Sequence, residues 1–169
     1  YFGDLGGQLF RVDFDNTQTT KEAVPKTPVL LLNLNDAEKS PRFYDTPSFS
    51  LYSSSGETFA LISIGSGNRS QPLQDFSAGD SSYDYDAIYN IYDKDVARRD
   101  LFNRAATAPL KTENIKKKQL GEITDSNRFS TTTPVAPYSS KGWYYRFQNC
   151  TAGVKQYDKD GKLIPTKCD

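Results

Sequence analysis

The side chains of this chain that could take part in catalysis are mainly carboxylates, because histidine is absent. Its absence excludes Ser-His and Cys-His nucleophile pairs, imidazole acid–base catalysis and nearly all common zinc sites. Asp84 and Asp86 could act as glycosidase carboxylates only at a separation of about 5–9.5 Å across a sugar ring. Their spacing on a strand puts both on one face without fixing that distance. We therefore expect solvated charges here and no enzymatic activity.

An aspartate-rich segment near the C-terminus, Asp158 to Gly161, begins like a calcium-binding loop, and Asp169 falls at the twelfth position. However, glycine stands at the fourth position where a calcium loop needs it at the sixth, and Lys162 places a positive charge where an oxygen ligand belongs. The dipeptide Asp-Gly is also common in β-hairpin turns, because these residues readily adopt positive φ. The sequence therefore favours a turn at this position.

The two cysteines of the chain, Cys150 and Cys168, flank that turn. A hairpin loop of about three or four residues centred near Lys159 places Cys150 opposite Cys168 or one residue away. Cross-strand neighbours at that spacing have Cβ atoms close to the separation that a disulfide requires. We predict a Cys150–Cys168 disulfide that closes a C-terminal hairpin over residues 148–169, and with it an oxidising compartment. Two buried free thiols are the alternative.

A glycine-rich segment, Ile64 to Arg69, has the composition of a phosphate-binding turn. It lacks the third glycine, the Lys-Ser/Thr pair and the following helical pattern that a phosphate cradle requires. The segment instead predicts a turn at the end of a strand. In that turn Gly65 and Gly67 are expected to have positive φ, and Arg69 to anchor a neighbouring loop.

The first fourteen residues predict a complete β-hairpin, in which aromatic Tyr1 opens one strand and alternating apolar residues up to Phe14 carry the return strand. The predicted turn residues are Gly3, Asp4, Gly6 and Gly7. Asp4 is expected to cap its own turn by accepting an Asx-type hydrogen bond from a backbone N–H. Because the chain begins inside a hairpin and has no Met, we expect a piece of a larger protein.

Further strands are predicted wherever short apolar segments stand between polar connections. They are residues 29–34, 48–52, 58–64, 87–93, a segment around Ile123, 142–147 and the arms of the C-terminal hairpin. The segment 58–64 is apolar on both faces and is expected to be a central strand. Helical patterning is limited to two turns each over 96–104, behind Asp95, and over 112–120. The loops 15–28, 66–84 and 104–141 exceed hairpin lengths and are expected to be decoration or binding surface.

The composition favours an all-β architecture with few short helices, since 11 Tyr and 10 Phe suit aromatic packing between sheets. Lys+Arg and Asp+Glu number 21 each, so no global field favours nucleic acid or a membrane surface. The lysine run 116–118 is expected to be a solvated surface that Glu113, Glu122 and Asp125 neutralise. No apolar run approaches the ~18 residues of a membrane-spanning helix.

Five segments, in order along the chain, resemble the C-terminal β-propeller of the PilC/PilY-type type IV pilus tip adhesins and biogenesis factors. Residues 1–14, YFGDLGGQLFRVDF, are similar to that family's Y-x-G-D-L-x-G-x-L-W-R-x-D signature, with Phe10 in place of Trp. The other similar segments are FALISIGSGNRSQPL (59–73), YDAIYNIYDKDV (85–96), LGEITD (120–125) and KGWYYRF (141–147). After Phe147 the chain departs from the family's G-E-R-V continuation.

The resemblance implies that residues 1–147 form several antiparallel blades of an incomplete β-propeller. Blades are four-stranded sheets of roughly 40–50 residues, so this chain supplies at most about three or four blades of a ring that needs about 4–8. Exposed blade faces would then need cover from the remaining propeller sequence or another chain. The family's calcium loop directly precedes the Y-x-G-D-L motif and would lie upstream of Tyr1, so no metal or other cofactor is assigned to this chain.

The function that the resemblance implies is that of a non-enzymatic, extracellular module at the tip of a type IV pilus, acting in surface attachment and pilus biogenesis. Minor pilins and a host or abiotic surface are the expected partners. Two alternatives stay open: a secreted sugar-binding β-domain, and a fragment of a quinone-dependent dehydrogenase on a propeller scaffold. The missing histidine and the absence of a repeated Trp-docking motif weigh against the dehydrogenase.

Overall fold

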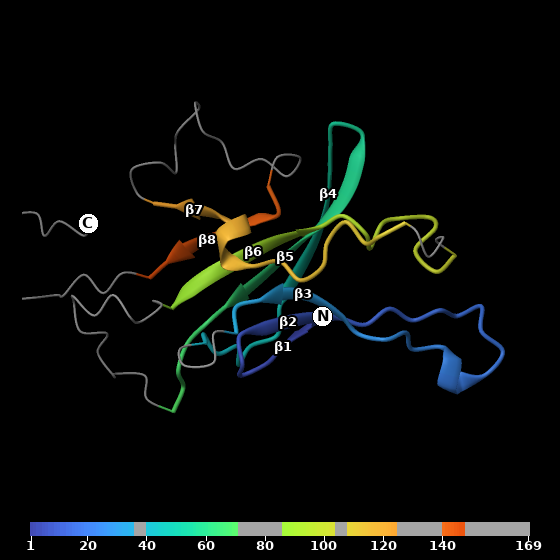
Figure 1. Cartoon of the computed structure of the whole chain (residues 1–169), viewed down its shortest axis with the longest axis horizontal. Helices are drawn as coiled ribbons and strands as arrows, with labels where there is room; N and C mark the ends of the chain where they lie inside the picture. The colour runs from blue at the N-terminus through green and yellow to red at the C-terminus, as the bar shows by residue number, and fades with distance from the viewer. Residues whose placement is uncertain (36–39, 71–85, 104–107, 125–139, 148–169) are drawn as a thin grey trace, which may run out of the picture.

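The computed structural model describes residues 1–35, 40–70, 86–103, 108–124 and 140–147, which fold into two β-sheets (Figure 1). Within these ranges the helical elements are two short 3-10 turns, η1 (Lys21–Ala23) and η2 (Lys117–Gln119). The all-β class is therefore confirmed. The sheets neither close nor curl into a ring over the described ranges. No helix found there has the length and apolar character to cross a membrane.

The first sheet confirms the predicted N-terminal hairpin. It contains β1 (Phe2–Gly3), β2 (Gln8–Arg11) and β3 (Val29–Asn33), antiparallel and in that order. Phe2 pairs with Phe10, and their rings stack with centroids 5.2 Å apart. The return strand ends at Arg11, earlier than the expected Phe14, because the chain there turns into a separate ribbon. In that ribbon Lys26 N–H donates to the Asp13 carbonyl over 2.9 Å.

The second sheet has the order β4-β5-β6-β8-β7. Its strands are β4 (Ser48–Ser54), β5 (Glu57–Gly65), β6 (Ala87–Asp93), β7 (Gly121–Ile123) and β8 (Gly142–Arg146). Strands β4, β5, β6 and β8 are successive antiparallel neighbours, and β7 joins β8 in parallel. The strands predicted within the described residues are confirmed, and the β4–β5 turn is the tight pair Ser55 and Gly56, both at positive φ as a two-residue hairpin turn requires.

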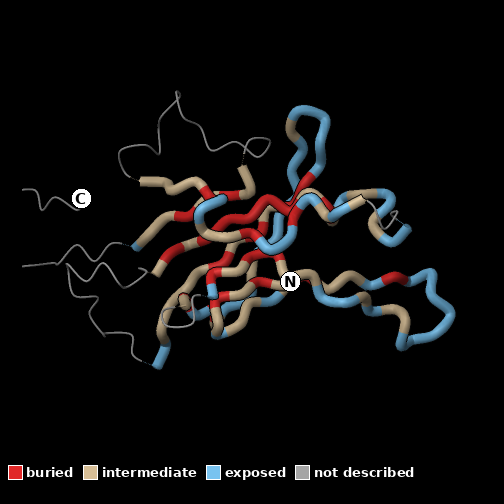
Figure 2. Tube along the Cα trace, in the orientation of Figure 1, coloured by how far each residue is buried: buried red, intermediate tan, exposed pale blue. Residues whose placement is uncertain are grey.

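Strand β5 is an interior strand, as its two apolar faces predict, because it lies between β4 and β6. Its residues Ala60, Ile62 and Ile64 are buried members of the core cluster, and Figure 2 shows buried segments running through the middle of the molecule. The middle of the five strands is β6, in which six of seven residues are buried. The first sheet therefore packs on β5 and β6.

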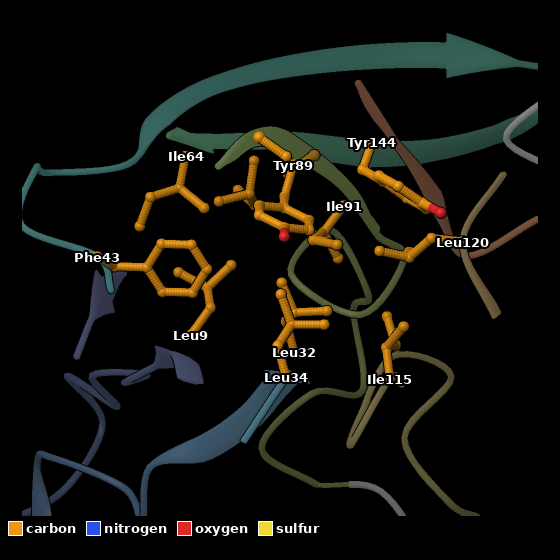
Figure 3. Packing of buried hydrophobic residues seen from close by; sticks show 13 residues of the cluster. Leu9, Leu32, Leu34, Phe43, Ile64, Tyr89, Ile91, Ile115, Leu120 and Tyr144 are labelled. Carbon is orange, nitrogen blue, oxygen red and sulfur yellow. The ribbon is translucent and has the colours of Figure 1, made fainter. Parts of the chain in front are cut away.

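The hydrophobic core lies between the two sheets (Figure 3). Leu9, Leu32 and Leu34 on the side of the first sheet face Tyr89 and Ile91 of β6. Phe43, from the connection before β4, meets Tyr89 edge to face with ring centroids 5.8 Å apart. Ile115 and Leu120 close one side of this core. Fully burying one such side chain contributes about 1.5–3 kcal/mol, so this interface is the main source of stability.

The helical turns expected behind Asp95 are absent from the described residues 96–103, which form a series of turns instead. The reason is the Asp95 carboxylate, which is buried and accepts hydrogen bonds from the backbone N–H groups of Lys111 (3.0 Å) and Thr112 (2.7 Å). It therefore holds a distant segment and does not cap a helix. Over 112–120, only η2 forms.

Candidate functional site

The Asp4 turn shows the arrangement that the sequence predicts. The Oδ1 atom of Asp4 accepts hydrogen bonds from the backbone N–H groups of Gly6 (2.9 Å) and Gln8 (2.8 Å). Gly7 has φ +76°, and a Cβ there would lie 2.9 Å from the Pro41 carbonyl oxygen, so glycine is required twice over. The Asp4 carbonyl also accepts from Phe43 N–H over 3.0 Å. The turn therefore positions the segment that delivers Phe43 to the core.

Gly3 has a different role from the turn role that the sequence suggests. It is the last residue of β1 and packs directly on the core. A Cβ there would lie 2.6 Å from the Cβ of Phe43 and 2.7 Å from Cδ1 of Ile64. Glycine at this position lets the first sheet approach the second. Gly6 has neither a positive φ nor a close backbone neighbour.

A buried ionic network lies at the other end of β2. The Nη1 atom of Arg11 donates to both carboxylate oxygens of Asp93, over 2.6 and 2.8 Å, and its Nε donates to Asp13 over 3.0 Å. The Tyr1 hydroxyl donates to the same Asp93 over 3.0 Å. Burial, followed by the charge of Asp93, raises the pKa of the Tyr1 hydroxyl well above its usual value. The tyrosine therefore stays protonated and serves as a hydrogen-bond donor.

Asp93 also orders the backbone beyond β6. Its Oδ1 accepts from the N–H groups of Asp95 (2.9 Å) and Val96 (3.3 Å). Every oxygen of this carboxylate is thus occupied by a donor of the fold. A carboxylate so engaged stabilises structure and is poorly placed to transfer protons. The sequence did not single out Asp93 or Arg11, although both fall within segments that resemble pilus-tip propellers.

A pocket of about 260 Å³ opens beside this network. Its polar wall comes from Arg11, Asp13, Lys26 and Thr27, and its apolar wall includes Leu101 and Phe102. The Lys26 ammonium lies 3.0 Å from the buried Asp15 carboxylate. The Nη2 atom of Arg11 is buried without a hydrogen-bond partner. The pocket therefore combines positive charge, one carboxylate and an exposed aromatic ring.

The glycine-rich segment after β5 corrects one prediction and confirms another. Gly65 and Gly67 do not have positive φ, because β5 remains extended through Gly65, which still pairs with Ile88. Gly67 N–H then donates to the Arg42 carbonyl over 3.1 Å. Arg69 does anchor a neighbouring loop: it forms an ion pair with Asp45, and its guanidinium lies over the Tyr44 ring, 5.7 Å from the centroid.

Gly142, at the start of β8, is another position that the sequence did not single out. Its φ is +154°, and a Cβ there would lie 2.1 Å from the carbonyl oxygen of Asn90 on β6. Only glycine allows this approach of two backbones. The segment KGWYYRF carries no local signal of this constraint, because the close neighbour lies on β6.

The candidate carboxylates and lysines are placed as follows. Asp86 is half-buried and accepts a hydrogen bond from the Ser66 hydroxyl over 3.1 Å, and burial raises its pKa. Glu122, expected to neutralise the lysine run, binds Arg146, whose Nε donates to it over 2.6 Å. Lys117 lies over the Tyr144 ring, 5.3 Å from its centroid. The described part of the chain contains no group of three or more side chains suited to a metal ion.

Several predicted features lie outside the described residues. They are Asp84, Asp125, the Asp158–Gly161 turn, the Cys150–Cys168 disulfide and the hairpin over 148–169. These stay predictions.

Three of the large apolar side chains that are exposed lie on β4. Phe49 is 49% exposed, Leu51 58% and Tyr52 50%. Phe2, on β1, and Phe14, in the ribbon after β2, are also exposed. Exposed aromatic and aliphatic groups clustered on one strand are typical of an interaction surface.

Comparison of the chain with protein-family models, with curated proteins and with solved structures finds no match.

Proposed function

We propose that this chain is a non-enzymatic adhesion and assembly module of a type IV pilus tip, and part of a β-propeller. The observation that carries the proposal is the contact between Arg11 and Asp93. These residues belong to two of the resembling segments, 1–14 and 85–96, and are buried against one another. A third segment joins them, since Gly3 packs on Ile64. Motifs that are far apart in sequence therefore support one packed unit.

The sheet arrangement gives a second argument. Strands β4, β5, β6 and β8 form four antiparallel neighbours, a pattern compatible with a propeller blade, and the parallel strand β7 is an addition to that pattern. The β1–β3 sheet packs on one face of this blade. By register, the opposite face carries Phe59, Leu61 and Tyr92. A blade inside a ring needs apolar residues on both faces, because it contacts a neighbour on each side.

The pilus role can be tested in the source organism by replacing the segment that encodes residues 1–169 with a linker and restoring it in trans. We expect loss of surface attachment and of assembled pili, with minor pilins recovered on the restored chain after affinity purification. Exchange of the exposed Arg69 for Ser is the matched control and should leave attachment intact. Unchanged piliation and attachment after deletion would contradict the proposal.

The pocket beside Arg11 favours sugar binding as a second candidate function. Lys26, Asp13 and Thr27 offer hydrogen-bond donors and acceptors, and Phe102 offers a ring for the apolar face of a sugar. A glycan array tests this with the purified chain, Lys26→Met and Phe102→Ala as site variants, and Phe14→Ala as an exposed control. Binding that both site variants abolish, without any affinity for minor pilins, would favour this candidate over the pilus role.

A further inference from the structure

We propose that β4 is a docking edge that pairs, antiparallel, with β4 of a second copy of this chain. Among the residues that the structure describes, β4 is the terminal strand of its sheet and pairs only with β5. Six of its seven residues are exposed. Figures 1 and 2 show the β4–β5 hairpin projecting from the body of the molecule with its surface uncovered.

This edge lacks the devices that normally protect an open strand. Edge strands are usually very short, or carry charges, prolines or bulges that prevent pairing with another chain. Here β4 runs for seven residues, SFSLYSS, without a charged residue or a proline. Its register with β5 is unbroken from Ser48–Ser63 to Ser54–Glu57, so no bulge twists the edge away. The unpaired backbone groups on its free side can therefore accept another strand.

Charge and symmetry argue for a second copy as the occupant. The edge is neutral and the chain has equal numbers of acidic and basic residues, so two copies do not repel one another. A two-fold axis through Ser50 would set Phe49 opposite the partner's Leu51 and, by symmetry, Leu51 opposite the partner's Phe49. Closed pairs of this isologous kind are the commonest homo-oligomers, and aromatic–aliphatic cross-strand pairs stabilise sheets.

The face that the pairing would complete is the core face. Phe49 pairs with Ile62 and Leu51 with Ala60 across β4 and β5, and both partners are buried. Phe49 and Leu51 therefore lie on the same face of the sheet as the core residues, but they are exposed to solvent at its edge. Tyr1 reaches the same area, with its ring centroid 5.8 Å from that of Phe49. A second β4 would shield Phe49 and Leu51 from water and continue the sheet.

The test is sedimentation velocity of the purified chain over a concentration series, together with amide hydrogen exchange at low and high concentration. We expect a reversible dimer, with slower exchange in β4 as concentration rises. Leu51→Lys should weaken dimerisation by on the order of tenfold or more, because each lysine would place a charge opposite the partner's Phe49 in the apolar cross-strand pair. Phe14→Lys, at another exposed apolar residue, is the matched control and should dimerise as the wild type does.

Because Leu51 is exposed, its exchange for lysine leaves the monomer folded, and circular dichroism would verify this. A chain that stays monomeric at all concentrations, with unchanged exchange in β4, would overturn the inference. So would a dimer that Phe14→Lys weakens and Leu51→Lys does not. The inference concerns self-association alone, so neither outcome bears on the pilus role.

Discussion

Arg11 and Asp93 form a buried ion pair that joins the two sheets. The Nη1 atom of Arg11 lies 2.6 Å from Oδ2 of Asp93, and the side chains are 2% and 0% exposed. Arg11 ends β2 of the first sheet, and Asp93 ends β6 of the second. With Tyr1 as an additional donor to the carboxylate, this pair fixes where the N-terminal hairpin lies on the larger sheet.

Breaking this pair is expected to destabilise the fold strongly. Asp93→Asn removes the more deeply buried of the two counter-charges of the Arg11 guanidinium and leaves only Asp13, and breaking a buried ion pair costs about 3–5 kcal/mol in comparable cases. Urea unfolding followed by the fluorescence of the single tryptophan measures the loss. Asp45→Asn is the matched control: it removes the ion pair with Arg69, in which both side chains are more than 60% exposed, and should cost less than about 1 kcal/mol. Equal losses in the two variants would contradict the structural role of Asp93.

The glycine at the start of β8 is expected to be irreplaceable. Gly142→Ala would force a Cβ to within 2.1 Å of the Asn90 carbonyl at a φ of +154°, so strain and backbone displacement together should cost at least about 2 kcal/mol. Gly65→Ala provides the contrast, because its Cβ would meet nothing within 4 Å and its φ is not positive. That variant should change stability by less than about 0.5 kcal/mol. Thermal unfolding of both proteins decides the matter, and similar melting temperatures would refute the expectation.

The strands could be predicted from the sequence because their signals are local. The apolar faces of β5, the apolar segment that forms β6 and the Asp4 turn each lie within a few residues, and all three are found where they are expected. The predictions that were wrong concern residues whose hydrogen-bond partners lie far away in the sequence. The sequence predicts helical turns behind Asp95. In the structure its carboxylate oxygens accept hydrogen bonds from the backbone N–H groups of Lys111 and Thr112, which belong to a later segment.

The buried Arg11–Asp93 pair and the exposed β4 edge could not be predicted from the sequence for the same reason. Arg11 and Asp93 are charged residues in strands, and nothing local distinguishes a buried pair from two solvated charges. Nothing in the local sequence around Phe49 and Leu51 indicates their exposure, which follows only from the position of β4 at the end of the sheet. The positive φ assigned to Gly65 was wrong because pairing with Ile88 continues the strand.

The two cysteines are predicted to be joined when the protein is made in an oxidising compartment. A thiol titration of the unfolded, unreduced chain should then find no free thiol, and reduction should release both Cys150 and Cys168. Reduction is expected to lower stability by roughly 3 kcal/mol, since the bridge closes a loop of about nineteen residues. Cys150→Ser should expose one titratable thiol and show the same lower stability. Two free thiols in the unreduced wild type would remove the predicted bridge.

Acid is expected to destabilise the chain in part through Asp15. Hydrogen bonds from the Thr17 and Gln18 side chains, over 2.6 Å each, lower the pKa of its carboxyl well below the usual value. As pH falls below about 4, the unfolded chain takes up this proton before the folded chain does. The stability that the ionised Asp15 contributes is therefore present above that pH and is lost as the pH falls. In Asp15→Asn, unfolding free energy should depend less on pH between about 5 and 2.

Asp86 is expected to show the opposite sign, because burial raises the pKa of its carboxyl. The folded chain holds this proton more tightly than the unfolded chain, so the contribution of Asp86 is present below about pH 4 and is lost as pH rises through the raised pKa. Asp86→Asn, which keeps an acceptor for the Ser66 hydroxyl, should therefore gain stability relative to the wild type as pH increases from about 3 to 6. Urea unfolding at several pH values checks both carboxylates in one experiment. If the two variants deviate from the wild type in the same direction, the opposed environments inferred for Asp15 and Asp86 are wrong.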